Sequence, residues 1–193
     1  DDKINTNIIT STNYMFGLFN SQIALGNTSL NKMMSCNRGL LNVIKNSGQR
    51  IYIKINDKFR MLTLSGIYEI GTNFSRWYYK FNDDVIIIEN YVLRDQTKIV
   101  LNVRSQKKIE YEFIITNQIV MGDREYSNGF YLNRELDRVM IKPLEGSFLS
   151  NTYKNINYQI NFFNCKFNLG DDGIFFKDNL GRDKSIITFK IEK

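Results

Sequence analysis

The centre of this chain reads IYIKI (51–55), FRMLTLSGIYEI (59–70), RWYYKF (76–81), VIIIENYVL (85–93), TKIVLNV (97–103) and KIEYEFIITNQIVM (108–121). Each run is short, rich in β-branched and aromatic residues, and followed by a few polar turn residues. Runs of this kind, with no helical pattern between them, are typical of consecutive antiparallel strands. The sequence therefore predicts an all-β fold, an antiparallel two-sheet sandwich with little helix.

The remaining sequence extends this pattern in both directions. Further strands are expected at 139–141, 156–162, 174–177 and 186–191. Any helix is expected before Ile51 or in the long connection 122–138. We predict an N-terminal arm over residues 1–22, with at most one strand around 14–19, and a single β-sandwich domain over 23–193. The chain opens at Asp1 without a methionine, so we expect a fragment of a larger multidomain enzyme.

Charge and histidine content narrow the classes of function. The net charge is +6, but the basic residues are dispersed, and the densest cluster is only Arg104, Lys107 and Lys108. A nucleic-acid partner is therefore disfavoured, because such proteins concentrate their positive charge on one face. The chain contains no histidine, which excludes Ser-His-Asp and Cys-His nucleophile systems and the usual catalytic zinc sites within it.

Cysteine content and hydropathy indicate the compartment. The two cysteines, Cys36 and Cys165, are far apart and match neither a disulfide framework nor a metal-site spacing. A single bridge between them stays open, but a reducing compartment fits better, so we expect a cytoplasmic protein. No apolar run approaches the ~20 residues of a membrane-spanning helix, so we expect no membrane association.

Paired carboxylates are the first candidates for a reactive site. Glu110 and Glu112 would share one face of the strand that starts at Lys108, about 7 Å apart, which suits glycoside hydrolysis by two carboxyl groups. We favour a solvated strand face, because apolar–polar alternation alone predicts it. The pairs 83–84 and 171–172 offer oxygen ligands for Ca²⁺, but turn chemistry also explains Asp beside Asn or Gly. We therefore predict no catalytic and no metal-binding residue.

Aromatic residues are the candidates for ligand binding. Trp77, Tyr78 and Tyr79 form the densest aromatic run, and solvent-facing rings on a sheet make stacking platforms for sugars or bases. In a strand, Trp77 and Tyr79 point away from Tyr78, so at least one side of the run belongs to the core. Trp77 and Tyr78 are the carbohydrate-binding candidates from this run.

Three phrases resemble a known family: SGIYEIG (65–71), ENYVLRDQTKIVLNV (89–103) and YEFIITNQIVMGDREY (111–126). They are similar to the N-terminal domain of glycoside phosphorylases of the cellobiose phosphorylase and 1,2-β-oligoglucan phosphorylase group. The resemblance covers about the central third of the chain. It implies a β-supersandwich that precedes an (α/α)6 catalytic barrel, and no cofactor, because inorganic phosphate is itself a substrate.

The same resemblance implies how the domain works. Enzymes of the group cleave a β-glucosidic bond with phosphate and invert the anomeric centre, using an Asp on the barrel that this chain lacks. The sandwich packs on the barrel, takes part in homodimer contacts, and lends loops to the rim of the substrate site. By this analogy the connection 122–138 is the place to look for oligosaccharide contacts. It contains Tyr126 and Tyr131.

Three hypotheses follow. The first is a non-catalytic N-terminal sandwich of a glycoside phosphorylase acting on β-gluco-oligosaccharides, inactive as an isolated chain. The second is a free-standing carbohydrate-binding or adhesin-like sandwich. The third is a basic nucleic-acid-binding β domain, which steep salt dependence of binding would reveal.

Overall fold

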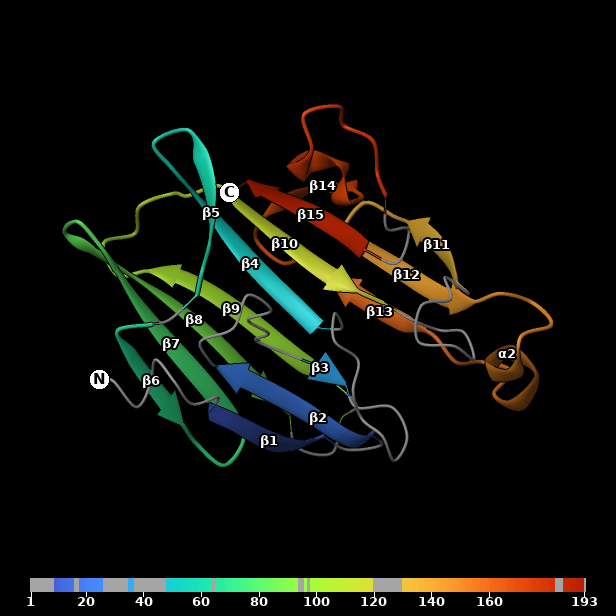
Figure 1. The fold of residues 1–193 in the computed structure, drawn as a ribbon. Coiled ribbons are helices and arrows are strands. Elements are labelled where there is room, and N and C mark those ends of the chain that lie inside the picture. The colour runs from blue at the N-terminus through green and yellow to red at the C-terminus, as the bar shows by residue number, and fades with distance from the viewer. Residues whose placement is uncertain are drawn as a thin grey trace. The chain divides into compact units, whose positions relative to one another are not determined.

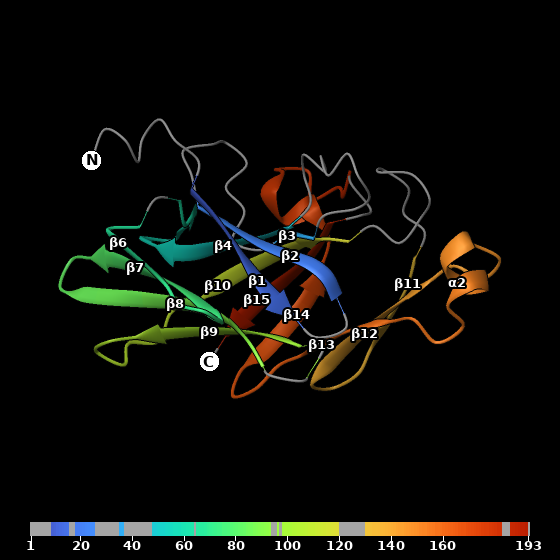
Figure 2. The ribbon, with the colours of Figure 1, turned by 90° about the horizontal axis from the view of Figure 1, so that it is seen from below.

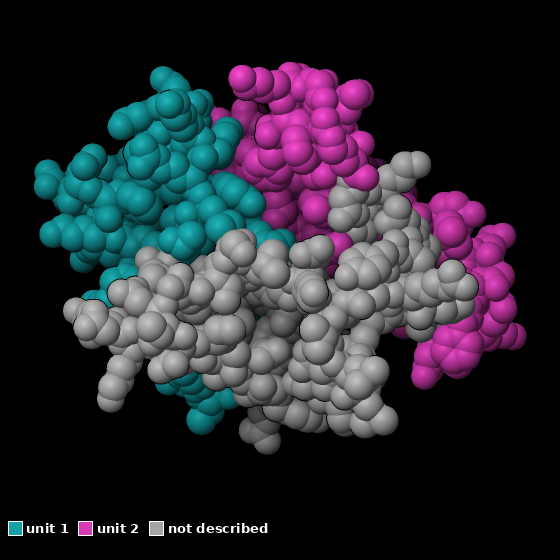
Figure 3. All heavy atoms as spheres, in the orientation of Figure 1, with its two compact units in different colours: residues 1–111 teal, residues 112–193 magenta. Residues whose placement is uncertain are grey.

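The computed structural model describes residues 9–15, 18–25, 35–36, 48–63, 65–93, 96, 98–119, 130–182 and 186–192. The chain divides into two compact units, residues 1–111 and residues 112–193 (Figure 3). The expected division into an arm of 1–22 and a domain of 23–193 stays a prediction.

The first unit consists of antiparallel strands. β1 (Ile9–Met15), β2 (Leu18–Leu25) and β3 (Ser35–Cys36) form one sheet, and β4 (Gly48–Ile55) pairs with β5 (Lys58–Met61). Residues 9–25 thus contain two strands where at most one was expected. The turn between β4 and β5 is Asn56-Asp57, whose φ angles of 49° and 60° give the positive values that a two-residue type I′ hairpin requires.

A four-stranded sheet completes this unit. Its order is β6 (Ile67–Ile70), β7 (Phe74–Phe81), β8 (Asp84–Val92) and β9 (Ile99–Ser105), and Figure 2 shows the four strands side by side. Burial alternates strictly along β7 and β8. The buried side contains Trp77, Tyr79, Ile86 and Ile88, so one face of this sheet forms core and the other is at least partly open to solvent.

The second unit contains two three-stranded antiparallel arrays (Figure 1). One has the order β14 (Lys166–Gly170), β15 (Ile186–Glu192), β10 (Phe113–Gln118). The other has the order β11 (Phe130–Arg134), β12 (Arg138–Pro143), β13 (Tyr158–Asn161). A helical turn, α2 (Phe148–Thr152), and a 3₁₀ turn, η1 (Asp172–Phe175), lie in the connections.

The core of the second unit is built by both arrays. Val139 and Ile141 of β12 pack with Phe167 of β14 and with Ile187 and Phe189 of β15. The Phe162 ring adds an aromatic layer, because its centre lies 4.0 Å from that of Phe167 and 4.9 Å from that of Phe189. Apolar faces of two sheets closed on one another are the defining feature of a sandwich, so the all-β, antiparallel fold class predicted from the sequence is confirmed.

Several local predictions were wrong. Helical turns lie at 148–152 and 172–175, where none was expected, and η1 replaces part of the strand expected at 174–177. Much of the two regions in which helix was expected, including 37–47 and 120–129, lies outside the described residues. The strand expected from Lys108 begins only at Phe113, and residues 114–118 are buried throughout. β10 has no solvent-exposed face, because both of its faces are covered.

Candidate functional site

Polar and aromatic side chains lie on the outer face of the β6–β9 sheet. Cross-strand pairing aligns them in rows. Glu69 lies opposite Arg76, Arg76 opposite Glu89, and Ile67 opposite Tyr78. Cross-strand partners on one face have their Cβ atoms about 4.5–5.5 Å apart. We call the group formed by Glu69, Arg76, Tyr78 and Glu89 the Arg76 face.

Arg76 sits at the centre of a hydrogen-bonded ion-pair network. Its Nη1 donates to Glu69 Oε2 at 2.9 Å, its Nε donates to Glu89 Oε1 at 3.0 Å, and its Nη2 also bonds Glu89. The Tyr78 hydroxyl donates to the same Glu69 oxygen. These bonds from Tyr78 and then Arg76 hold the pKa of Glu69 below its usual range, and bonds to Tyr78 and Glu89 raise the pKa of Arg76.

This electrostatic state limits what the Arg76 face can do chemically. A general acid at neutral pH needs a carboxyl group whose pKa is raised by burial or by a like charge. Glu69 is instead held in its charged form by two donors. The arrangement therefore suits hydrogen bonding and packing, and it does not supply an acid catalyst.

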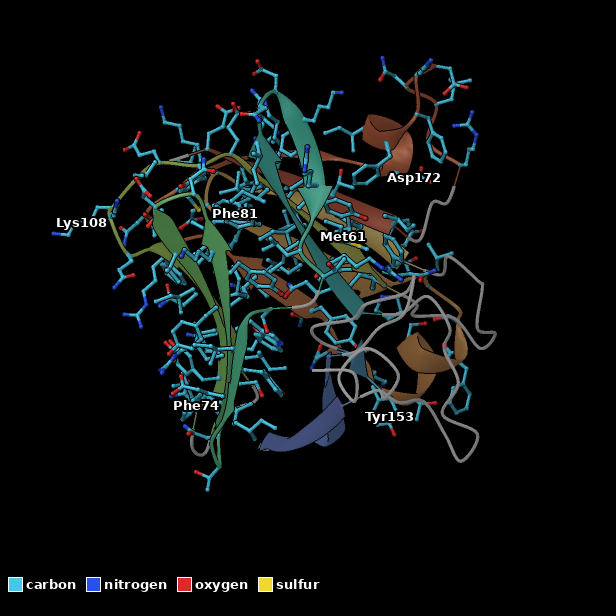
Figure 4. The ribbon with its side chains drawn as sticks, turned by 60° about the vertical axis from the view of Figure 1, so that its left-hand side comes forward. Met61, Phe74, Phe81, Lys108, Tyr153 and Asp172 are labelled. Carbon is cyan, nitrogen blue, oxygen red and sulfur yellow. The ribbon has the colours of Figure 1, made fainter. Side chains whose placement is uncertain are left out.

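Apolar side chains border the network. The Arg76 guanidinium lies 4.9 Å from the centre of the Phe74 ring, and Figure 4 shows Phe74 at one end of β7 and Phe81 at the other. Ile67 and Ile70 of the edge strand β6 are 61% and 53% exposed. The Tyr78 ring, the fixed charges and the exposed Ile67 side chain thus share one sheet face, whereas Ile70 lies on the alternate face of β6.

The carbohydrate-binding candidates have different surroundings. Trp77 is fully buried, with its ring stacked on Tyr68 at 5.3 Å between centres. It therefore offers no ring face to a ligand, because strand alternation turns it into the core. Tyr78 is half-buried on the Arg76 face, and Tyr131 is 57% exposed on β11 of the second unit. Tyr126 lies outside the described residues.

The carboxylate pairs mostly serve turns and ion pairs. Asp171 accepts from the backbone N–H of Gly173 at 2.8 Å, and Asp172 accepts from that of Arg182 at 2.7 Å. Glu112 pairs with Lys190 at 3.3 Å, and Glu110 is exposed outside any strand. In the described part of the chain, no three His, Cys, Asp or Glu side chains gather to hold a metal ion.

Asp84, which is buried as Asp172 is, has a different role. It is almost completely buried and accepts from Ser105 Oγ at 2.6 Å, Tyr111 Oη at 2.9 Å and the backbone N–H groups of Val85 and Lys107. Burial by itself raises the pKa of this carboxyl, but the four hydrogen bonds outweigh it and bring the pKa to about 2. Asp84 therefore anchors the segment after β9, with Lys108 at its exposed turn (Figure 4).

The remaining predictions from composition concern cysteine and membrane. Cys165 is a free thiol whose pKa is raised by burial, and the side chain of Cys36 lies outside the described residues. Among the described residues, no helix has the length and apolar character needed to cross a membrane.

Sequence reasoning missed Glu69, Arg76 and Glu89 as a group. They lie on three strands, up to 20 positions apart in sequence, and each looks like an ordinary exposed charge in its own strand. A signal was present, since opposite charges on neighbouring strands of a meander attract when the register places them face to face. The sequence does not give that register.

Arg76→Ala is expected to lower the free energy of unfolding by about 1–3 kcal/mol, because the Glu69 pair is open to solvent but Arg76 and Glu89 are only 24% and 16% exposed and hydrogen-bonded to each other. Urea denaturation measures this difference, with Lys80→Ala, an exposed residue of the same strand, as the control. A loss of more than about 3 kcal/mol would contradict this expectation, because losses of that size follow the breaking of a buried pair.

Comparison with known proteins completes the description. A family model described as "glycoside phosphorylase supersandwich domain" matches residues 1–193. A 1,2-β-oligoglucan phosphorylase of Listeria innocua serovar 6a is 34% identical over 174 residues, which cover 90% of this chain and 16% of that protein. This chain thus spans about a sixth of the length of that relative. The chain belongs to the glycoside phosphorylase supersandwich domain family.

Proposed function

We propose that this chain is the supersandwich domain of a glycoside phosphorylase that acts on β-gluco-oligosaccharides with inorganic phosphate. The observation that carries this proposal is the family match over residues 1–193 together with the 34% identity to a 1,2-β-oligoglucan phosphorylase. Since the match spans only 16% of that enzyme, a separate catalytic domain in the parent chain does the chemistry.

In this proposal the domain has a structural role and does not carry out the chemical step. Its contributions are a packing surface for the catalytic barrel, contacts within a homodimer, and part of the substrate rim, in a cytoplasmic enzyme. The Arg76 face supports a packing role, because Glu69 and Glu89 are both ion-paired with Arg76 while Ile67 on the same face is exposed. Interfaces between domains combine such polar and apolar surface.

The proposal predicts a clear division of activity. The full-length protein that contains this chain is expected to release glucose 1-phosphate from β-1,2-gluco-oligosaccharides only when inorganic phosphate is present. The 193-residue chain alone is expected to release none, because it has no histidine, and the pKa values of Glu69, Asp84 and Asp178 are lowered rather than raised as a general acid requires. A coupled assay for glucose 1-phosphate measures both proteins, with phosphate-free buffer as the control.

One observation keeps a second function in view. A half-exposed Tyr78 beside fixed donors and acceptors is also the arrangement that a carbohydrate-binding sandwich uses. A full-length protein with no phosphorolysis of any β-glucoside, together with glucan binding that Tyr78→Ala abolishes, would replace the phosphorylase proposal by a free-standing binding module.

A further inference from the structure

A groove of about 190 Å³ lies in the second unit, where β14 and β15 meet the segment that contains η1. Figure 4 labels Asp172 in this segment. The volume is below the roughly 300–1,000 Å³ of pockets that enclose a drug-sized ligand, so the groove suits a single small ring. Its lining residues are Asn168, Leu169, Gly170, Asp171, Gly173, Ile174, Asn179, Thr188 and Lys190.

Strand register builds the floor of this groove. Asn168 pairs with Lys190 and Gly170 pairs with Thr188, so these four residues share one face of the sheet. The core residues Phe167 and Phe189 lie on the other face. The hollow depends on Gly170, because a Cβ atom there would come within 3.1 Å of Thr188 Oγ1.

Hydrogen bonds fix the position of the groove wall. Thr188 Oγ1 donates to the Asp171 carbonyl oxygen at 2.7 Å, and the Asp171 carboxylate accepts from the Gly173 N–H. Gly181 closes on the same carboxylate, since a Cβ atom at that position would lie 2.2 Å from Asp171 Oδ2. The groove is therefore preformed, which lowers the entropic cost of binding.

The charged side chains in and around the groove disfavour the binding of an anion. Lys190 is the cation of the groove, and its ammonium already lies 3.3 Å from Glu112 and 3.1 Å from Glu192. An incoming phosphate would meet two carboxylates beside one ammonium. The exposed amides of Asn168 and Asn179 instead offer neutral donors and acceptors.

Apolar surface stands beside these polar groups. Ile174 is 44% exposed on one wall, and the exposed Phe176 ring follows two residues later with the Arg182 guanidinium 4.0 Å above it. A glucose ring presents hydroxyl groups at its edge and C–H groups on its face. Amide groups next to exposed aliphatic and aromatic side chains match both.

We propose that this groove binds one glucose unit of a β-gluco-oligosaccharide, an inference that rests on the proposed function for its choice of sugar. Asn168 and Asn179 bond the hydroxyl groups of the ring, and Ile174 contacts its apolar face. The groove then holds a longer glucan chain on the domain, so it acts in substrate capture rather than in bond cleavage.

The test is hydrogen–deuterium exchange in the full-length protein, without phosphate, with and without a long linear β-1,2-gluco-oligosaccharide. The oligosaccharide is expected to slow exchange in peptides that cover 166–182. Asn168→Trp, which fills the groove, is expected to abolish this protection. Asn168→Ala is expected to weaken it about tenfold in sugar concentration, as the loss of about one hydrogen bond predicts.

The matched control is Asn133→Trp. Asn133 is also an exposed asparagine on the outermost strand of an array in the second unit, and it does not line the groove. Unchanged protection in Asn168→Trp, no protection in the parent protein, or protection by inorganic phosphate alone would each overturn the groove proposal. Phosphorolysis is assayed separately, so its absence would overturn the proposed function without being confused with the result for the groove.

Discussion

Trp77→Ala is expected to lower the free energy of unfolding by about 3–5 kcal/mol, the range for truncating a buried aromatic residue to alanine. Trp77 is fully buried and its ring stacks on Tyr68. Its removal leaves the largest cavity that one substitution can make on the buried face of the β6–β9 sheet. Chemical denaturation followed by circular dichroism measures the loss.

Two further substitutions make this prediction specific. Tyr78→Ala, on the same strand but half-buried on the opposite face, is expected to cost clearly less. Trp77→Phe is expected to cost less than Trp77→Ala, in part because the indole N–H has no hydrogen-bond partner among the described residues and its loss relieves a buried unpaired donor. Equal losses for Trp77→Ala and Tyr78→Ala would contradict the assignment of the two faces.

Acidification is expected to destabilise the protein through Asp84. The pKa of this carboxyl is lowered in the folded state, from an ordinary value of 3.8 to about 2, by bonds from Ser105, Lys107, Tyr111 and Val85 that outweigh the opposing effect of burial. A carboxyl group with a lowered folded-state pKa contributes stability that is fully present above the unfolded-state value. That stability is lost as the pH falls from 3.8 through 2.

Asp84→Asn tests this linkage directly. The variant is expected to be less stable at neutral pH, because an amide replaces the charged acceptor of Tyr111 and Ser105, and to lose less further stability between pH 4 and pH 2. Asp83→Asn, the exposed neighbour, serves as the control and should keep the acid dependence of the parent. The measurement is the free energy of unfolding against pH. Parallel curves for the parent and Asp84→Asn would contradict the role of this carboxylate.

The sequence by itself determined the fold class and the family. Period-two alternation predicted that Trp77 and Tyr79 point away from Tyr78, as they do in β7, but it did not say which side is buried. The dipeptide Asn56-Asp57 forms the turn between β4 and β5 with positive φ at both residues. Both signals are local, because side-chain direction in a strand and positive φ in a turn depend on adjacent residues only. The resemblance of three short phrases pointed to the family that the whole chain matches.

Tertiary structure alone decided the sites. Glu69, Arg76 and Glu89 meet only because β6, β7 and β8 pair in one particular register, and the groove exists only because Asn168 lies beside Lys190. The alternation after Lys108 predicted a solvated strand face, which was wrong for the same reason. β10 is buried along its length, and its burial is determined by its neighbours rather than by its own residues. Register and coverage arise from contacts between segments distant in sequence, so no local pattern encodes them.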